Sequence, residues 1–222
     1  MADYTATRDR VEDYFDRSAT KVWERLTSDA PVSRIRQTVR EGRDRMRALM
    51  LSRLPGDLRG ARVLDAGCGT GLMTADLAAR GAHVVAVDIS PQLIAIADAR
   101  LADPLRDRVT FHAGDMTAPE LGQFDYVLAM DSLIYYGTRD IAAILHKMGP
   151  RTATAMVFTV APRTPFLMTF FTLGKAFPRA DRSPTMVPHA FATLARSAGP
   201  GLSRIDRVSC GFYISECLEY RP

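Results

Sequence analysis

Short apolar runs alternate with amphipathic stretches through the middle of the chain. Runs with the length and composition of buried strands lie at 62–65, 83–87, 109–113, 124–130 and 154–160. The segments 72–79 and 92–101 between them are rich in Leu, Ala, Ile and Met, and they predict helices. Ser90 and Pro91 have the pattern of an N-cap followed by proline in the first turn. This alternation of strands and helices predicts a parallel sheet with right-handed crossovers.

The two ends of the chain have other patterns. Apolar side chains at three- and four-residue steps predict an amphipathic helix over 5–27 with one aromatic face. A second helix over 32–54 carries seven arginines and ends before Pro55. Near the other end, 202–209 and 212–220 predict an antiparallel pair of strands. Because the two helices precede the first strand, we expect them to pack on the sheet or to lie across its carboxyl edge as a lid.

A glycine-rich turn joins the first strand to the first helix of the alternating region. The sequence Asp-Ala-Gly-Cys-Gly-Thr-Gly spans 65–71, so three alternate glycines lie between two regular elements. Glycine accepts positive φ and has no Cβ, which lets the backbone approach a bound molecule at the positive N-terminus of a helix. We therefore expect a ligand at this turn, although a plain tight turn would have the same composition.

The spacing of the glycines indicates which ligand binds. The dinucleotide motif G-x-G-x-x-G is not met, because Leu72 stands where the third glycine is needed. The phosphate-binding motif G-x-x-x-x-G-K-[ST] is also absent. The second strand ends in Asp88, 23 residues after Asp65, and an acid at that edge of a parallel sheet suits ribose hydroxyls. A nicotinamide-dependent oxidoreductase is therefore the enzyme class that the glycine spacing supports least.

Composition narrows the class of protein. With 222 residues, 47% hydrophobic and 24% charged, the chain fits one globular domain with an N-terminal addition. The three cysteines form no CxxC motif and no metal-like cluster with the four histidines. We expect reduced thiols, no metal site and a cytoplasmic protein. The charged residues among the first ten argue against a signal peptide.

Charge is distributed unevenly along the chain. Residues 1–60 carry 13 basic and 10 acidic side chains, 61–150 carry 7 and 11, and 151–222 carry 9 and 4. Basic ends around an acidic middle suit an anionic substrate or acidic lipid headgroups, although solvated helix faces would carry the same charges. Nucleic acid is not an expected partner, because the sequence has no recognised binding module and no ladder of aromatic and basic residues.

Residues 161–190 interrupt the alternation. The segment 165–177 is strongly apolar, but its length of about 13 residues is less than the roughly 18 that a membrane span needs. Three interpretations stay open: a buried helix, one wall of a large apolar substrate pocket, or a helix on a membrane surface. The loop 179–189 has turn-forming residues. We expect His189 to be a cap or a surface residue, with substrate contact as the alternative.

The glycine turn and Asp88 resemble those of the class I S-adenosylmethionine-dependent methyltransferases. Further stretches resemble the magnesium-protoporphyrin IX O-methyltransferases of chlorophyll and bacteriochlorophyll synthesis, over nearly the whole chain. The stretches that carry this resemblance are 11–16 with Trp23, 65–71, 131–136, 182–186 and 211–216. The glycine turn is common to the superfamily, so the matches near the two ends carry the assignment to the narrower family.

The resemblance implies a fold and a domain organisation. The fold is the Rossmann-like class I methyltransferase α/β fold, with a seven-stranded, mostly parallel sheet, an antiparallel closing hairpin and an N-terminal helical lid. Residues 1–58 are expected to form the lid or arm, and 59–222 the S-adenosylmethionine-binding domain. Within that domain, 161–190 is expected to be an insertion that contributes to the substrate pocket.

The resemblance also implies a reaction. The methyl group of S-adenosylmethionine passes to one propionate carboxylate of magnesium-protoporphyrin IX, which gives the monomethyl ester and S-adenosylhomocysteine. Magnesium enters only as part of the porphyrin. Magnesium chelatase, which makes the substrate, is an implied partner, and peripheral contact with the inner or intracytoplasmic membrane stays open. Two other functions stay open: methylation of a quinone or small carboxylic acid with the same cofactor, and a noncatalytic porphyrin carrier.

The superfamily analogy implies a set of cofactor contacts. Asp65 is expected to hold the amino group of the methionine moiety, Asp88 the ribose, and Asp115 with Met116 the adenine. The full set of expected cofactor residues is Asp65, Ala66, Gly67, Cys68, Gly69, Gly71, Asp88, Ile89, Asp115, Met116, Met130 and Asp131.

Tyr14 and Tyr135 are the expected catalytic side chains, with a core tyrosine as the alternative for each. The phenol of Tyr14 would orient the carboxylate, or its ring would face the sulfonium. Family members commonly have a histidine where Tyr135 stands, so a general-base histidine is not carried over to this chain. A propionate is already ionised at neutral pH, so no proton has to be removed from it. Catalysis is then expected to depend on alignment of the reacting atoms in a dry pocket.

Overall fold

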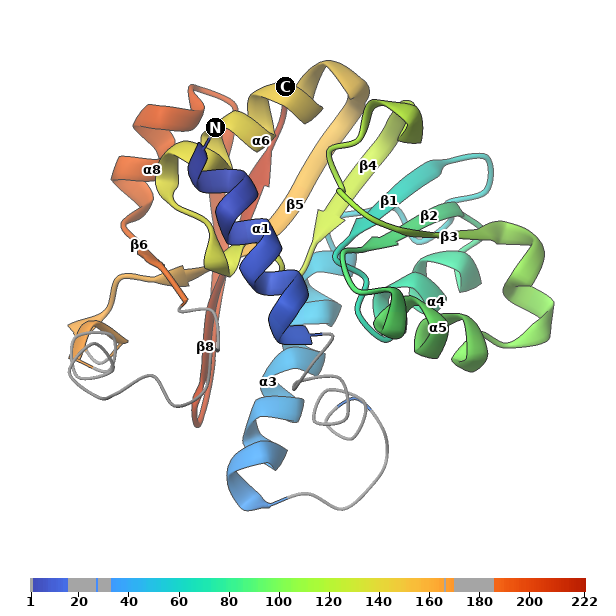
Figure 1. The fold of residues 1–222 in the computed structure, drawn as a ribbon, viewed down its shortest axis with the longest axis horizontal. Helices are drawn as coiled ribbons and strands as arrows, with labels where there is room; N and C mark the ends of the chain where they lie inside the picture. Colours follow the sequence, from blue (N-terminus) through green and yellow to red (C-terminus); the bar gives the residue numbers. More distant parts are fainter. Residues whose placement is uncertain (1, 16–26, 28–32, 166, 170–185) are drawn as a thin grey trace.

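The structure is a computed structural model that describes residues 2–15, 27, 33–165, 167–169 and 186–222. Its centre is a mixed sheet with the strand order β3-β2-β1-β4-β5-β8-β7 (Figure 1). The parallel strands are β1 (Arg62–Ala66), β2 (His83–Asp88), β3 (Val109–Ala113), β4 (Phe124–Ala129) and β5 (Thr152–Pro162). The closing hairpin consists of β7 (Leu202–Cys210) and β8 (Tyr213–Tyr220), and β8 is antiparallel to both of its neighbours.

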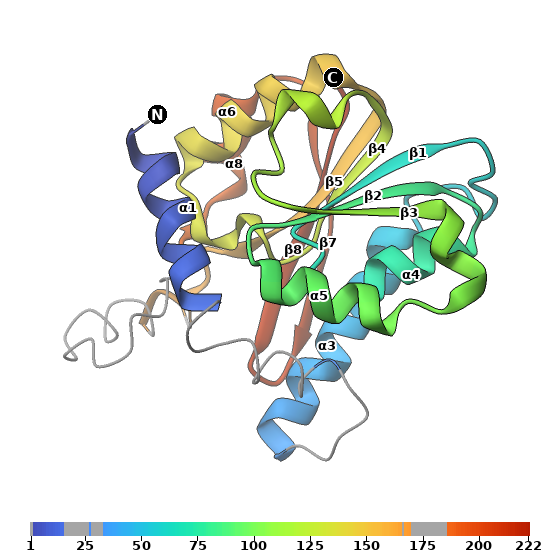
Figure 2. The same ribbon diagram turned by 45° about the vertical axis from the view of Figure 1, so that its right-hand side comes forward.

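Helices cover both faces of this sheet (Figure 2). On one face lie α3 (Arg34–Leu51), α4 (Leu72–Ala79) and α5 (Pro91–Arg100), and on the other lie α6 (Thr138–Met148) and α8 (Phe191–Ala198). Short 3-10 helices occur at Asp103–Arg108, Pro119–Leu121, Leu133–Tyr135 and Gly149–Arg151.

Side chains that alternate along the strands feed two separate hydrophobic cores. In β1, Val63 joins a cluster that contains Met46 of α3 and Leu77 of α4. Its neighbour Leu64 joins the other cluster, which contains Leu145 of α6. Successive side chains of a strand point to opposite faces, so both faces of the central strands are buried. This is why these strands form continuous apolar runs in the sequence rather than alternating ones.

The two N-terminal helices have different places. α3 packs against β7 and β8. α1 (Ala2–Tyr14) crosses the carboxyl edge of the sheet instead (Figures 1 and 2). It contacts Asp115 after β3 at one end, and Phe15 just beyond its other end packs on Leu93 of α5. Both expected arrangements therefore occur, one in each helix: α3 packs on the sheet, and α1 lies across its carboxyl edge.

The predicted strands and helices are confirmed, and three boundaries need correction. Ser33 caps the N-terminus of α3, with its Oγ accepting from Arg36 N–H, and the helix ends at Leu51 rather than at 54. The first helix does not extend to Thr27, which lies in a turn, while residues 16–26 lie outside the described residues. β5 is longer than predicted, because it pairs with β8 and also with β6 (Pro188–His189), a two-residue eighth strand.

Most of the segment 161–190 lies outside the described residues. Within it, Pro165 and 167–169 are helical, and the two residues of β6 are extended. The interpretations of 165–177 and of the loop 179–189 therefore stay predictions. No helix among the described parts of the chain is long and apolar enough to cross a lipid bilayer.

Candidate active site

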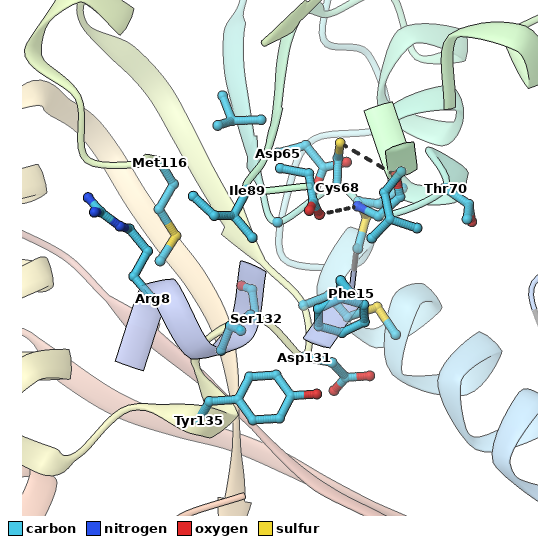
Figure 3. Close-up of a pocket in the computed structure, with 18 of the residues that line it drawn as sticks. Arg8, Phe15, Asp65, Cys68, Thr70, Ile89, Met116, Asp131, Ser132 and Tyr135 are labelled. Carbon is cyan, nitrogen blue, oxygen red and sulfur yellow. Dashed lines mark hydrogen bonds between the residues drawn. The ribbon is translucent and has the colours of Figure 1, made fainter. Parts of the chain in front are cut away.

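A large cavity lies at the carboxyl ends of the central strands, beside the point where the strand order reverses between β1 and β4. The space that it encloses is about 1030 Å³, including the part open to solvent. Figure 3 shows side chains of α1 and of the turns after β1, β2, β3 and β4 converging on it. The lining residues are Tyr4, Arg8, Val11, Phe15, Thr27, Arg43, Arg47, Asp65, Gly67, Cys68, Gly69, Thr70, Leu72, Met73, Val87, Asp88, Ile89, Leu93, Gly114, Asp115, Met116, Met130, Asp131, Ser132, Tyr135 and Tyr136.

The glycine turn has the backbone conformation that its sequence predicts. Gly67, Gly69 and Gly71 have φ values of 81°, 55° and 84°. A Cβ at Gly67 would lie 2.4 Å from the Cβ of Ser132, so this close approach requires glycine. A Cβ at Gly69 would have no neighbour within 4 Å, and Gly69 lines the cavity. The turn therefore offers an open backbone surface at the N-terminus of α4, where a ligand can approach closely.

Asp65 lies near the end of β1 and is 1% exposed. Its Oδ2 accepts a hydrogen bond of 2.6 Å from the Thr74 hydroxyl. Burial raises the pKa of Asp65 from 3.8 to about 7, and the charge of Asp88 adds to this rise, while the hydrogen bond from Thr74 opposes it. A cationic ligand group would favour the ionised form, so the position of Asp65 suits an ammonium group.

Asp88 ends β2 and holds the glycine turn to the start of α5. Its Oδ2 accepts from Gly69 N–H at 2.8 Å, and its Oδ1 accepts from Ser90 N–H at 3.0 Å. Ser90 in turn caps α5, as its sequence predicts. Burial raises the pKa of the nearby Cys68 thiol, and the charges of Asp88 and Asp65 raise it further. This thiol therefore stays protonated at neutral pH and is not a nucleophile.

One face of α1 contacts the cavity at the Asp115 side. The Tyr4 hydroxyl donates to Asp115 Oδ1 at 2.8 Å, and Arg8 Nη1 lies 3.6 Å from Asp115 Oδ2. The Tyr4 ring stacks on Tyr136 with a centroid separation of 5.1 Å. Burial opposes the ionisation of Asp115, but hydrogen bonds from Thr117 and Tyr4 hold its pKa below the ordinary 3.8. Asp115 is therefore ionised at neutral pH, and it binds α1 directly through the hydrogen bond from Tyr4.

Tyr135 follows β4, and Figure 3 shows its hydroxyl directed toward Asp131. The Phe15 ring meets it edge to face, with the centroids 6.5 Å apart. Burial raises the pKa of Tyr135 well above its ordinary value, and the charge of Asp131 adds to the rise. The phenol therefore keeps its proton, so it can donate a hydrogen bond but cannot act as a general base at neutral pH.

Three arginines bring positive charge to the cavity wall, and each is near a carboxylate. Arg8 lies beside Asp115, as described above. Arg43 of α3 pairs with Asp131, and Arg47 one turn further pairs with Asp76 of α4 at 2.8 Å. A ligand with two anionic groups could therefore meet guanidinium groups on both helices, namely Arg8 on α1 and Arg43 with Arg47 on α3.

Most of the expected site residues line the cavity, namely Asp65, Gly67, Cys68, Gly69, Asp88, Ile89, Asp115, Met116, Met130, Asp131 and Tyr135. Ala66, Gly71 and Tyr14 are not among the lining residues. Ala66 packs in the core beside α6, and Gly71 is the N-cap residue of α4. Tyr14 packs against Phe15, with the centroids 5.3 Å apart. A role for these residues in binding or catalysis stays a prediction.

The sequence pattern did not point to Tyr4, Arg8, Arg43 or Arg47 as site residues. A signal for the first two is present, because Tyr4, Arg8, Val11 and Phe15 recur at intervals of four, three and four and so share one helical face. Tyr14, one position before Phe15, is rotated by about 100° from that face. Helix phase therefore explains why Phe15 lines the cavity and Tyr14 does not.

His189 is a structural residue rather than a surface one. It is 3% exposed, its Nε2 lies 3.0 Å from the Tyr136 carbonyl, and its Nδ1 lies 3.1 Å from Thr138 Oγ1. Burial lowers its pKa, against the effect of the hydrogen bond to Tyr136. The expectation of a surface position was therefore wrong, and His189 holds the turn that leads into α6.

In the described ranges, no group of three or more His, Cys, Asp or Glu side chains could hold a metal ion.

Known proteins match this chain along its whole length. The family described as "Methyltransferase domain" matches residues 63–151, and the one described as "Magnesium-protoporphyrin IX methyltransferase C-terminus" matches residues 129–222. The magnesium-protoporphyrin O-methyltransferase of Rhodobacter capsulatus is 66% identical over 100% of this chain and 99% of its own. The chain belongs to the magnesium-protoporphyrin O-methyltransferase family.

Solved structures confirm the class I methyltransferase fold for this member of the magnesium-protoporphyrin O-methyltransferase family. The magnesium protoporphyrin IX methyltransferase of Synechocystis PCC 6803 with bound SAH has a TM-score of 0.79 at 29% identity, over 96% of this chain and 98% of that chain. The same enzyme with bound SAM has a TM-score of 0.76 at 25% identity, over 97% of each chain. A ubiquinone biosynthesis O-methyltransferase of Xanthomonas oryzae pv. oryzae is 40% identical, but over 35% of this chain.

Proposed function

We propose that this chain uses S-adenosylmethionine to methylate magnesium-protoporphyrin IX, forming the methyl ester of one propionate and S-adenosylhomocysteine. The observation that carries the proposal is a single cavity that combines an open glycine turn and two buried acids with arginines of α1 and α3. The relative that covers the whole chain at high identity is named for this activity.

The residues of the cavity fit the cofactor. The cofactor supplies an electrophilic methyl group on a sulfonium when it is bound. The open backbone at Gly69 leaves room for its methionine part, and the Asp65 carboxylate would hold the ammonium. Asp88 would hold the ribose from the end of β2, and Asp115 with Met116 would lie at the adenine.

The other part of the cavity suits an apolar dicarboxylate. Arg8, Arg43 and Arg47 favour its negative charges, while Val11 and Phe15 are buried apolar side chains that exclude water. A propionate of ordinary pKa, about 4 to 5, needs no base at neutral pH. This agrees with a phenol at Tyr135 that keeps its proton and would orient a carboxylate oxygen by donating to it. Because opposite charges neutralise each other during transfer, a dry cavity favours the reaction.

We also propose a domain organisation in which residues 1–58 are a lid or arm on the methyltransferase domain 59–222. The hydrogen bond from Tyr4 of α1 to Asp115 at the cavity supports a lid role for α1. Opening of α1 would admit the porphyrin, and closure would exclude water from the reacting atoms. A substrate-pocket role for 161–190, handover of the porphyrin from magnesium chelatase and peripheral contact with a membrane stay predictions.

A comparison of acceptors tests the proposal. The full-length protein is incubated with S-adenosylmethionine labelled with tritium in the methyl group, together with magnesium-protoporphyrin IX, a hydroxylated quinol or a small carboxylic acid. We expect label in the porphyrin alone. Label in the quinol or the small acid alone would favour the alternative acceptor, and porphyrin binding without any transfer would favour the carrier.

Two variants control this assay. Asp88→Asn removes the charge that is expected to hold the ribose, so transfer should fall by about tenfold or more. Asp98→Asn changes an exposed carboxylate on α5 that pairs with Arg106, and it should leave transfer unchanged.

A further inference from the structure

The residue that follows β4 has an unusual backbone conformation. Asp131 has a φ of 54°, and it is the only residue other than glycine with positive φ in the part of the chain that the structure describes. Such a conformation persists only where the surroundings hold it. The next residue, Ser132, donates to the Ala66 carbonyl at 2.8 Å and packs against Gly67. The conformation at Asp131 therefore affects where the glycine turn lies.

The side chain of Asp131 is held by donors from three separate elements. Arg43 of α3 pairs with Oδ2. The hydroxyl of Tyr213 in β8 lies 3.1 Å from Oδ1 and 3.3 Å from Oδ2. Thr159 of β5 accepts from Asp131 N–H at 2.7 Å and donates to Oδ1 at 3.2 Å. Because the Asp131 side chain is only 8% exposed, these protein donors take the place of water and fix its orientation.

Close packing of α3 on the closing hairpin places Tyr213 in this network. A Cβ at Gly42 would lie 2.6 to 2.8 Å from the Cδ1, Cβ and Cγ atoms of Tyr213, so the helix can approach the strand only with glycine at this position. The same approach brings the next residue, Arg43, to Asp131. Burial and the charge of Asp131 raise the pKa of Tyr213, so its phenol keeps the proton that it donates.

We propose that Tyr213 is a positioning residue for methyl transfer and that it acts through Asp131. The proposal rests on the proposed function. The Tyr213 hydroxyl holds the carboxylate of Asp131, the residue with left-handed φ, and the chain continues from there through Ser132 into the 3-10 helix that ends at Tyr135. Methyl transfer requires alignment of donor and acceptor, and a small displacement lowers the rate steeply. Tyr213 is not among the cavity-lining residues, so removing its hydroxyl should lower kcat more than it lowers the affinity for either ligand.

The test compares two tyrosines of the same strand. Tyr213→Phe removes the hydroxyl and keeps the ring, and Tyr220→Phe makes the same change at the other end of β8. We expect kcat to fall about tenfold in Tyr213→Phe, with both KM values and the affinity for S-adenosylhomocysteine within about twofold of wild type. Tyr220→Phe should match the wild type. A wild-type kcat in Tyr213→Phe would overturn the proposal, and so would an equal loss in both variants.

Two further measurements identify the route through Asp131. In a double-mutant cycle with Asp131→Asn, the effect of Tyr213→Phe on kcat should largely disappear, and additive effects would overturn the proposal. Without substrate, amide hydrogen exchange over 130–136 should be faster in Tyr213→Phe than in Tyr220→Phe. Unchanged exchange would overturn the positioning role whether or not the wild type is active. A wild type that does not methylate the porphyrin would overturn the proposed function instead.

Discussion

The substitution Asp65→Asn should stabilise the ligand-free protein while weakening its hold on the cofactor. Asp65 is 1% exposed, and its burial raises its pKa from 3.8 to about 7. That difference corresponds to about 4 kcal/mol in favour of the protonated form. Asparagine keeps an acceptor for the Thr74 hydroxyl and carries no charge, so it avoids this penalty.

The sign of the effect on stability follows from proton binding. Between pH 3.8 and about 7, the folded protein keeps a proton at Asp65 that the unfolded chain has released. Asp65 therefore makes the folded state progressively less stable as the pH rises through this range, and its penalty is constant above it. Between pH 5.5 and pH 8.0, the free energy of unfolding of Asp65→Asn should gain about 2 kcal/mol relative to wild type, or about 4–8 °C in Tm.

Denaturant unfolding of the ligand-free protein at these two pH values measures the difference. Asp57→Asn is the control, because the hydrogen bonds from Arg59 lower the pKa of the exposed Asp57 to about 2, outside the tested range. Its difference from wild type should not change with pH. A difference between Asp65→Asn and wild type that is the same at both pH values would show that burial does not raise the pKa of Asp65. Calorimetry should show S-adenosylhomocysteine binding to Asp65→Asn about 10- to 100-fold more weakly, and wild-type affinity would refute the ammonium contact.

Three other substitutions test other parts of the account. Tyr4→Phe removes the hydrogen bond between α1 and Asp115, so stopped-flow should show S-adenosylhomocysteine leaving about tenfold faster, and an unchanged rate would contradict α1 as a lid. Replacing glycine by alanine ordinarily stabilises a helix by about 1 kcal/mol. In Gly42→Ala, contact with Tyr213 should instead lower the free energy of unfolding by about 1–3 kcal/mol, and a stabilised variant would show that the packing can relax. Tyr14→Phe should lower turnover more than cofactor affinity, and unchanged turnover with weakened cofactor binding would exclude the catalytic role predicted for Tyr14.

The sheet and the glycine turn could be predicted because their signals are local. Each central strand is buried on both faces, so it forms an apolar run that sequence alone can delimit to within a few residues. The turn after β1 needs positive φ at Gly67, Gly69 and Gly71, and that need fixes the residue type. The acid at the end of β2 is found by its position at the same sheet edge, without knowledge of any contact.

The remaining site residues depend on contacts between distant segments. Arg43 reaches Asp131, 88 positions away, because Gly42 lets α3 lie against Tyr213. This packing between distant segments leaves no periodic pattern in the sequence. Tyr14 was expected to be catalytic because it lies on the aromatic face of the first helix and in a stretch that resembles the family, but the phase of α1 places Phe15 rather than Tyr14 among the cavity-lining residues. His189 looked like a loop residue, since the strand β6 that buries it has only two residues and a weak signal.

The proposed function depends on this cavity, where a sulfonium methyl donor would meet a propionate of a magnesium porphyrin. The most direct measurement is the mass of the porphyrin after reaction of the wild-type protein with magnesium-protoporphyrin IX and S-adenosylmethionine that carries a trideuterated methyl group. We expect one trideuteromethyl ester per porphyrin, removed by mild alkaline hydrolysis, and an equal amount of S-adenosylhomocysteine. An unmodified porphyrin, or a label that survives ester hydrolysis, would contradict it.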